Sequence, residues 1–344
     1  MKTSILPTRM VAYSFQRTAI LKLSKPVVCP LHPIATQSAK GEGIIGEILD
    51  IIRGTRRSGM SRILVIGARG MLGRDLMKVL GSSSGDEIMG WDLEEIDITH
   101  EKDTLDRVEQ ARPEIVINVA AYTNVDGCES ERDRAFAVNA EGMRHVALGA
   151  RTCGAKVVYL STDYVFDGKK GQPYLEADSP HPLNVYGRSK WMGECYVQEL
   201  TDQALIIRTQ WLFGKHGRNF VTSILRQSQE KQELAIVDDQ IGSPTYTLDL
   251  ANTIGGLIQR KAKGIFHVVN SGFCSWYSFG RMILDISGRR DVRVKPITSK
   301  ELSRPAIRPG YSVLGCEKLK REAGMTLRPW LEALKDFLQS LQEG

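Results

Sequence analysis

The feature that most constrains the fold is a glycine-rich turn between a short apolar run and a segment of helical periodicity. The run is Arg62–Ile66 (RILVI), and the turn that follows contains Gly67, Gly70 and Gly73. The first glycine permits a tight turn, the second lets a pyrophosphate approach the backbone, and the third lets a helix pack closely on a strand. A strand, a glycine turn and a helix in this order predict the first unit of a dinucleotide-binding α/β fold.

Four further apolar runs repeat the pattern of a strand followed by a helix. They are Glu87–Trp91, Glu114–Val119, Lys156–Leu160 and Ala204–Arg208. Runs that are apolar nearly throughout are typical of parallel strands buried on both faces. We therefore predict an α/β fold: a doubly wound parallel (Rossmann) sheet with a smaller C-terminal α/β lobe that binds substrate.

The domain boundaries follow from where this pattern begins and ends. Residues 61–213 are predicted to form the dinucleotide-binding domain, and 214–344 mostly the substrate-binding domain, with about 244–272 returning to the first domain. Residues 1–60 are predicted to be an extension outside the compact fold, either disordered or misassigned. Because residues 1–41 carry six Lys and Arg and no acidic residue, a transit peptide is the alternative.

Composition narrows the range of partners. The 344-residue chain has a formal net charge of +6, but several positive charges fall in the first sixty residues and no basic stripe is interleaved with aromatic residues. We therefore expect no nucleic-acid partner. The six cysteines show no CxxC or Cys/His spacing, which predicts no metal site and reduced thiols in the cytoplasm. No apolar run approaches the ~20 residues of a membrane span, so we expect no membrane partner.

A tyrosine and a lysine in the segment YGRSK are candidates for proton chemistry. Tyr186 and Lys190 are four residues apart, so on a helix they lie on one face. A nearby ammonium favours a phenolate, and we expect it to lower the tyrosine pKa so that the hydroxyl exchanges a proton with a substrate oxygen near neutral pH. The structural alternative is a solvated helix with an amphipathic tyrosine.

Polar or small residues follow several predicted strands. Asp92 follows the second strand, where a carboxylate could accept ribose hydroxyls, Ala120–Thr123 follow the third and could admit a flat cofactor, and Thr162 and Asp163 follow the fourth. Ligands of open α/β sheets bind outside the carboxyl ends of strands, so these residues are predicted to face one crevice. Each could instead be an ordinary polar turn. Arg69, in the glycine turn, could meet a 2'-phosphate, so we expect both NADPH and NADH to be used.

In this order and spacing, the motifs resemble those of the extended short-chain dehydrogenase/reductase family, and within it the dTDP-4-dehydrorhamnose reductase branch. They are the glycine turn, STDYVFDG at 161–168, NVYGRSK at 184–190, RTQW at 208–211, DQIGSPT at 239–245 and RPAIRP at 304–309. The resemblance runs from about Arg62 to the C-terminus. It implies a catalytic role for Thr162, Tyr186 and Lys190, with Tyr186 as proton donor to the sugar C4 oxygen.

The resemblance also implies contacts with a cofactor and a substrate. The implied substrate-binding residues are Thr162, Asp163, Tyr186 and Trp211. The implied cofactor-binding residues are Gly67, Gly70, Met71, Leu72, Gly73, Asp92, Asp97, Ile98, Ala120, Ala121, Tyr122, Thr123, Tyr186 and Lys190.

The implied activity is NAD(P)H-dependent reduction of the C4 keto group of dTDP-4-dehydro-L-rhamnose to dTDP-L-rhamnose. Two alternatives stay open: a non-catalytic regulatory subunit like the methionine adenosyltransferase β subunit, and a reductase or epimerase of another nucleotide sugar.

Some relatives bind Mg²⁺ through glutamates at a homodimer interface. The first of those positions is Asp75 here rather than glutamate, so Mg²⁺ binding and a homodimer both stay open as alternatives.

Overall fold

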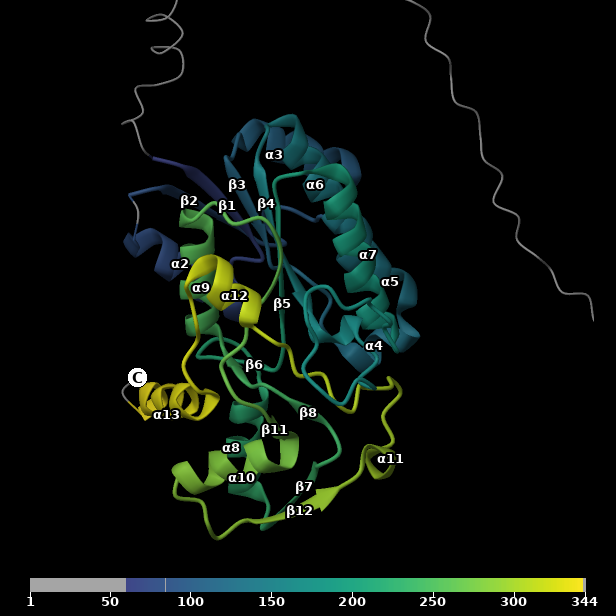
Figure 1. Ribbon diagram of the computed structural model, residues 1–344, viewed down its shortest axis with the longest axis vertical. Helices are drawn as coiled ribbons and strands as arrows, with labels where there is room; N and C mark the ends of the chain where they lie inside the picture. The colour runs from purple at the N-terminus through teal and green to yellow at the C-terminus, as the bar shows by residue number, and fades with distance from the viewer. Residues whose placement is uncertain (1–59, 84, 343–344) are drawn as a thin grey trace, which may run out of the picture. The chain divides into compact units, whose positions relative to one another are not determined.

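The computed structural model describes residues 60–83 and 85–342 (Figure 1). The predicted extension, residues 1–60, lies outside these residues except for Met60. No helix among the described residues combines the length and the apolar character needed to cross a bilayer.

Six parallel strands form the central sheet, in the order β10-β5-β4-β3-β1-β2. The chain runs from β1 to β2 at one edge and then crosses to β3 on the other side of β1, so the carboxyl ends of β1 and β3 form the topological switch point. The predicted doubly wound parallel sheet is confirmed. Its strands are β1 (Arg62–Ile66), β2 (Glu87–Trp91), β3 (Ile115–Asn118), β4 (Lys156–Thr162), β5 (Ala204–Thr209) and β10 (Gly264–His267).

Helices cover both faces of this sheet (Figure 1). Alternate residues of β1 show why both faces are apolar: Ile63 and Val65 pack against one helical layer, and Leu64 and Ile66 against the other. The first layer contains α2 (Met71–Ser83), α9 (Thr247–Gln259) and α12 (Glu317–Ala323), and the second contains α3 (Glu101–Ala111), α6 (Gly142–Thr152) and α7 (Val185–Leu200).

The helical segment between β3 and β4 that begins at Arg132 contains a break in its hydrogen-bond pattern. It begins as α5 (Arg132–Phe136), continues as a π-helical turn η1 (Ala137–Glu141) and ends as α6. Such π turns often occur at functional sites. Here the turn carries Asn139, which is buried.

The C-terminal lobe has its own apolar core, formed by buried residues such as Phe213, Phe279 and Phe337. Its main elements are α8 (Phe220–Glu230), β7 (Glu233–Val237), α10 (Trp276–Ile286), β12 (Arg293–Ile297) and α13 (Trp330–Gln342), with β7 and β12 paired in parallel. Between these elements the chain returns to the central sheet through β10, which pairs with β5. The remaining short elements are α4 (Val125–Ser130), η2 (Asp163–Val165), β6 (Leu212–Phe213), β8 (Ile241–Gly242), β9 (Thr245–Tyr246), β11 (Cys274–Ser275) and α11 (Ser299–Leu302).

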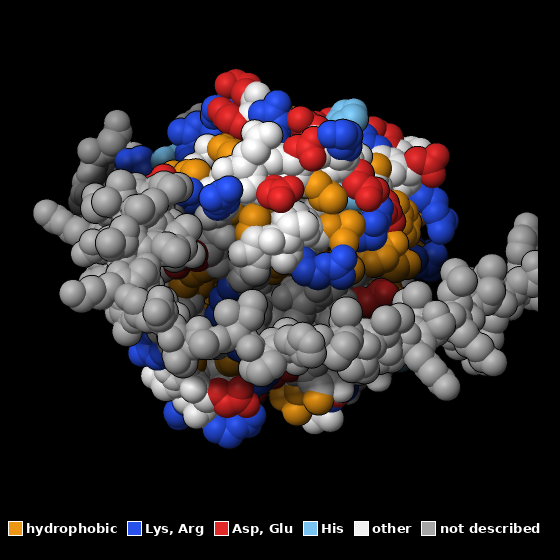
Figure 2. Space-filling model, turned by 90° about the horizontal axis from the view of Figure 1, so that it is seen from above, with side chains coloured by type: hydrophobic (Ala, Val, Ile, Leu, Met, Phe, Trp, Pro, Cys, Tyr) orange, Lys and Arg blue, Asp and Glu red, His pale blue; other side chains and the backbone are white. Residues whose placement is uncertain are grey.

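Basic and acidic side chains are interspersed on the part of the surface that is visible in Figure 2. Mixed charges of this kind are typical of an ordinary solvated surface.

Candidate active site

The glycine turn lies where the sequence predicts it, between the end of β1 and the start of α2. Gly67 has φ +86°, which an L side chain rarely adopts, and a Cβ there would lie 2.7 Å from the Ala120 amide nitrogen. A Cβ on Gly73 would lie 2.0 Å from the Gly67 carbonyl oxygen. The two glycines therefore let the turns after β1 and β3 meet and let α2 begin close against the turn.

Asp92 lies at the carboxyl end of β2, beside the glycine turn. One of its carboxylate oxygens accepts a hydrogen bond from the Arg69 amide at 2.9 Å, and the other from the Leu93 amide at 3.0 Å. Asp97 lies further along the same loop, where its carboxylate accepts hydrogen bonds from the backbone and hydroxyl of Thr99. Ile98 is buried at that point. Asp92 thus adjoins the turn directly, whereas Asp97 stabilises the loop that follows.

Asn139 holds the loop that follows β3. Its Oδ1 accepts a hydrogen bond from the Tyr122 amide at 2.8 Å, and its Nδ2 donates to the Tyr122 carbonyl at 3.1 Å and to Ser189 Oγ at 3.0 Å. The π turn therefore connects the predicted cofactor loop, Ala120–Thr123, to helix α7. Asn139 was not predicted as a site residue, because no local sequence pattern marks where a helix widens into a π turn.

Tyr186 lies in the first turn of α7, after Asn184, whose side chain caps the helix at the Gly187 amide at 2.8 Å. The ring of Tyr186 packs edge-on against Tyr164, with centroids 5.7 Å apart. Burial, the nearby Asp163 carboxylate and Tyr164 raise the pKa of Tyr186, while a hydrogen bond with Thr162 lowers it. The expectation of a lowered phenol pKa is wrong for this structure, because desolvation of the phenolate outweighs any stabilisation by Lys190.

Thr162 and Asp163 form a buried polar chain that begins beside Tyr186. Thr162 Oγ1 donates to Asp163 Oδ1 at 2.9 Å, and Ser312 Oγ donates to Asp163 Oδ2 at 2.5 Å. Burial raises the pKa of Asp163 to about 7, although both hydrogen bonds lower it. Asp163 is 2% exposed, so its carboxylate holds Thr162 and Ser312 in place within the protein.

Lys190 lies one helical turn beyond Tyr186 and is 3% exposed. Its Nζ lies 4.1 Å from the ring centroid of Tyr159, and burial lowers the lysine pKa to about 7, while the charge of Glu194 raises it. The Tyr159 hydroxyl donates to the Asn139 carbonyl at 3.1 Å. Tyr159 thus supports the ammonium through its π face and the π turn through its hydroxyl.

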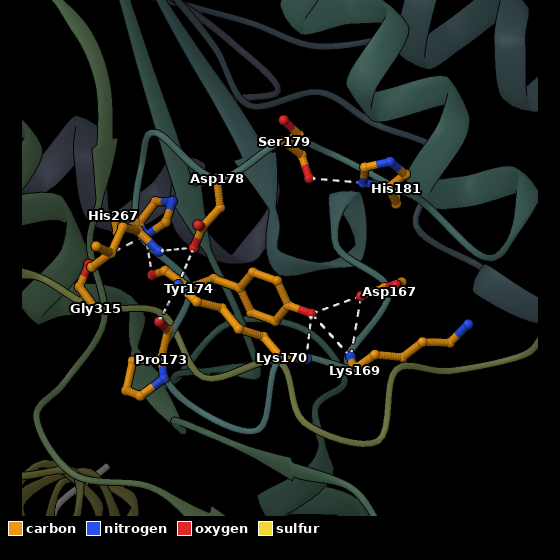
Figure 3. Close-up of polar contacts among 11 residues, drawn as sticks. Asp167, Lys169, Lys170, Pro173, Tyr174, Asp178, Ser179, His181, His267 and Gly315 are labelled. Atoms are coloured by element: carbon orange, nitrogen blue, oxygen red, sulfur yellow. Dashed lines mark hydrogen bonds and ion pairs between the residues drawn. The ribbon is translucent and has the colours of Figure 1, made fainter.

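Hydrogen bonds hold the loop that joins β4 to α7, which contains Asp167 and Tyr174 (Figure 3). The Tyr174 hydroxyl donates to Asp167 Oδ1 at 2.7 Å, and His267 Nδ1 lies 3.1 Å from the Tyr174 carbonyl and 3.2 Å from that of Gly315. Because both neighbours are acceptors, Nδ1 carries the proton. Burial and the charge of Arg208 lower the pKa of His267 to about 3, so the imidazole stays neutral.

A pocket of about 1080 Å³ lies next to the Tyr186 site, and Tyr164 forms part of its wall. Trp276 lines this pocket, whereas Trp211 does not and instead stacks on Trp276 at a centroid separation of 3.6 Å, with a left-handed backbone (φ +49°). The lining residues come from the central-sheet domain (Thr123, Asn124, Val125, Asp126, Tyr164) and from the C-terminal lobe and final loop (Arg218, Phe220, Ser223, Ile224, Gln227, Leu234, Ala235, Ile236, Val237, Gln240, Trp276, Leu302, Arg304, Arg308).

Asp75, the position considered for Mg²⁺, is 6% exposed and accepts a hydrogen bond from Thr247 Oγ1 at 2.6 Å. His216 Nε2 lies 4.0 Å from its other oxygen. Within residues 60–83 and 85–342, no group of three or more His, Cys, Asp or Glu side chains could hold a metal ion. The expectation of Mg²⁺ therefore receives no support, because Asp75 is engaged by α9.

Known proteins share this combination of motifs and fold. The family model described as RmlD substrate binding domain matches residues 60–343. A dTDP-4-dehydrorhamnose reductase of Streptomyces griseus is 41% identical over 286 residues, which cover 81% of this chain and 94% of that protein. This chain belongs to the dTDP-4-dehydrorhamnose reductase family.

Two further proteins match most of this chain and nearly all of their own length. The spore coat polysaccharide biosynthesis protein SpsK of Bacillus subtilis is 42% identical and covers 81% of this chain and 98% of that protein. The crystal structure of dTDP-4-dehydrorhamnose reductase from Bacillus anthracis in complex with NADP has a TM-score of 0.79 and 40% identity, over 82% of this chain and 99% of that one. The resemblance inferred from the sequence motifs is thus confirmed.

In this member of the dTDP-4-dehydrorhamnose reductase family, the late RPAIRP segment closes one side of the pocket. Arg308 makes two hydrogen bonds to Asp126, with donor–acceptor distances of 3.0 and 2.9 Å, and Arg304 makes a third at 3.1 Å. Asn184 Nδ2 donates to the Ile307 carbonyl at 2.8 Å. The segment therefore connects α4 and α7, which the order of motifs along the chain could not reveal.

Proposed function

We propose that the chain reduces the C4 keto group of dTDP-4-dehydro-L-rhamnose to give dTDP-L-rhamnose, using NADPH or NADH. The observation that carries this proposal is the position of Thr162, Tyr186 and Lys190. Tyr186 hydrogen-bonds to Thr162 at the carboxyl end of β4, and Lys190 lies one helical turn further along α7. The ring of Tyr186 packs against Tyr164, which lines a pocket large enough for a nucleotide sugar. A purely nucleotide-binding subunit would need none of these three side chains.

The glycine turn fits the pyrophosphate of a dinucleotide. Because Gly67, Gly70 and Gly73 keep side chains out of the turn, phosphate oxygens can reach the N-terminus of the 13-residue helix α2, whose first backbone amides have no partner within the helix. We propose that these glycines, Met71, Leu72, Asp92 and Ala120–Thr123 hold the cofactor. We propose that Asp97 and Ile98 also contact the cofactor, and that Tyr186 and Lys190 bind its nicotinamide ribose. The reduced nicotinamide supplies the hydride for the reaction.

We propose that Tyr186 gives the proton to the C4 oxygen. Because its raised pKa keeps the phenol protonated near neutral pH, the proton is present before negative charge develops on that oxygen. Thr162 can donate to the same oxygen once its hydroxyl turns away from Asp163. In its protonated form, which the lowered pKa of about 7 confines to neutral and lower pH, Lys190 supplies positive charge where the oxygen becomes negative.

The substrate is proposed to bind in the 1080 Å³ pocket between the two domains. Trp276 presents an aromatic surface that the stacked ring of Trp211 supports, and Arg218 is an exposed cation suited to a diphosphate. In this assignment, residues 61–213 bind the cofactor and residues 214–344 mostly bind the sugar nucleotide, except for about 244–272 in the central-sheet domain. Asp163 contributes by holding the Thr162 hydroxyl in place until the substrate oxygen takes over that hydrogen bond.

A cytoplasmic location and a homodimer are parts of the same proposal. The thiols of the five described cysteines are unpaired, which favours a reducing compartment. The mass of the purified protein in solution, measured by sedimentation, tests the dimer.

A second candidate substrate is another dTDP-4-keto sugar. A dTDP-4-keto-6-deoxy-D-glucose reductase of Streptomyces niveus is 40% identical over 275 residues, with 95% of that protein covered. The chemistry at C4 would be the same, and only the pocket contacts would differ.

The test is oxidation of NADH and NADPH with a panel of 4-keto dTDP sugars. Tyr186→Phe should lower kcat/KM by about 10²- to 10⁴-fold, roughly 3 to 5 kcal/mol, while cofactor binding survives. Tyr196→Phe is the matched control, because Tyr196 lies on the same helix and its hydroxyl donates to Glu141 at 2.7 Å. If Tyr186→Phe keeps more than about a tenth of wild-type kcat/KM, Tyr186 is not the proton donor.

A further inference from the structure

The end of β2 and the glycine turn form one hydrogen-bonded unit. The amides of Gly67 and Ala68 donate to the Trp91 carbonyl at 2.8 and 3.0 Å, and the Arg69 amide donates to Asp92. Arg69 therefore lies beside the carboxylate that suits a free ribose 2'-hydroxyl. A 2'-phosphate, which distinguishes NADPH from NADH, would enter at the same place.

Glu95 holds the Arg69 side chain there. One of its carboxylate oxygens accepts a hydrogen bond from Arg69 Nη2 at 2.5 Å, and the other from the Asp92 amide at 2.8 Å. Glu94, with its side chain 81% exposed, approaches the same guanidinium at 3.2 Å. Glu95 is thus anchored at both oxygens, whereas Glu94 makes a single, more solvated contact.

The negative charges around Arg69 oppose the binding of a 2'-phosphate. Three carboxylates, those of Asp92, Glu94 and Glu95, face two guanidinium groups, because Arg74 also reaches the turn and donates through Nε to the Arg69 carbonyl at 3.0 Å. A dianionic 2'-phosphate would have to displace Glu95 from Arg69 and lie beside Asp92. A 2'-hydroxyl meets neither obstacle and can donate to Asp92.

We propose that Glu95 is a specificity-determining residue that withholds Arg69 from a 2'-phosphate and so makes NADH the preferred cofactor. The inference rests on the proposed function, since it concerns the adenosine end of the same cofactor site. The preference is expected to stay below about a thousandfold, because Arg69 is exposed and the ion pair can open.

The experiment is a fluorescence titration of the full-length protein with NADH and with NADPH, which requires no turnover. The wild type should bind NADH more tightly. Glu95→Gln keeps an acceptor for the Asp92 amide but loses the charge, and it should move the ratio of the two Kd values about tenfold towards NADPH. The double variant Arg69→Ala/Glu95→Gln should lose this shift of the Kd ratio towards NADPH. Glu94→Gln, the matched control, should move the ratio less than threefold.

The outcomes separate this inference from the proposed function. Tighter wild-type binding of NADPH, or a ratio that Glu95→Gln leaves within twofold of the wild type, overturns the role of Glu95 alone. A shift towards NADPH that persists in Arg69→Ala/Glu95→Gln also overturns the role of Glu95 in withholding Arg69. It would instead indicate that Arg74 binds the 2'-phosphate, and Arg74→Ala in the Glu95→Gln background would then remove the shift. Binding of neither dinucleotide overturns the proposed function and this inference together.

Discussion

Replacing Glu194 by Gln should destabilise the protein more than any exposed charge change of the same kind. Glu194, on α7, accepts two hydrogen bonds from Arg208 on β5, at 2.9 Å from Nε and 2.6 Å from Nη2. The two side chains are 0% and 2% exposed. Arg208 pairs in register with Ser161 on one side and His267 on the other, so its charge is inside the sheet.

The magnitude follows from what the substitution leaves behind. Arg208 would remain charged with no carboxylate, next to a neutral imidazole and with the ring of Phe166 5.1 Å away. Its Nη1 already has no hydrogen-bond partner among the described residues. Breaking one side of a buried ion pair typically costs about 3 to 5 kcal/mol, a large share of the roughly 5 to 15 kcal/mol of a typical domain.

Urea unfolding followed by fluorescence measures this cost. Asp103→Asn is the matched control, because Asp103 pairs with Arg107 Nε at 2.9 Å on the surface, where both side chains are 49% exposed. The control should cost less than about 1 kcal/mol. A loss below about 1 kcal/mol for Glu194→Gln would refute the assignment of an uncompensated buried charge. If that variant does not fold, the double variant Glu194→Leu/Arg208→Leu should fold, since it removes both charges.

Three further perturbations test other parts of the structure. Burial lowers the pKa of Lys190 to about 7, so above that pH the folded state binds fewer protons than the unfolded state. The free energy of unfolding of the wild type should therefore rise by up to about 1.4 kcal/mol per pH unit from pH ~7 towards pH ~10. Lys190→Met should remove this contribution to the pH dependence, measured by urea unfolding at pH ~7.5 and ~9. An unchanged pH dependence would contradict the burial of the Lys190 amine. Gly73→Ala should weaken NADH binding at least about tenfold, or ~1.4 kcal/mol, because its Cβ would displace the Gly67 carbonyl. Gly81→Ala on the same helix, with nothing within 4 Å, should leave binding unchanged and stabilise the protein by roughly 0.5 to 1 kcal/mol. Trp276→Ala should raise the KM for the keto sugar about tenfold while the KM for the cofactor stays within about twofold; equal rises in both would place Trp276 outside the sugar site.

Local patterns predicted most elements of the central sheet to within a few residues. Continuous apolar runs identified β1 to β5, because strands buried on both faces have no polar positions to obscure the pattern. The short strand β12 was missed, since its sequence, RVKPI, is mostly polar and its pairing with β7 depends on a partner about sixty residues away.

The sequence by itself determined which residues could take part in chemistry: the glycine turn, Thr162, Tyr186 and Lys190 follow from residue type, spacing and position after predicted strands. Only the tertiary structure decided their electrostatic state. Burial raises the pKa of Tyr186, although the neighbouring lysine predicts a lowered pKa. Arg69, which the sequence predicts to be free for a 2'-phosphate, forms an ion pair with Glu95. The physical reason is that desolvation and charge pairing depend on every group within a few ångströms, and the groups that surround these residues come from strands and loops far away in the chain.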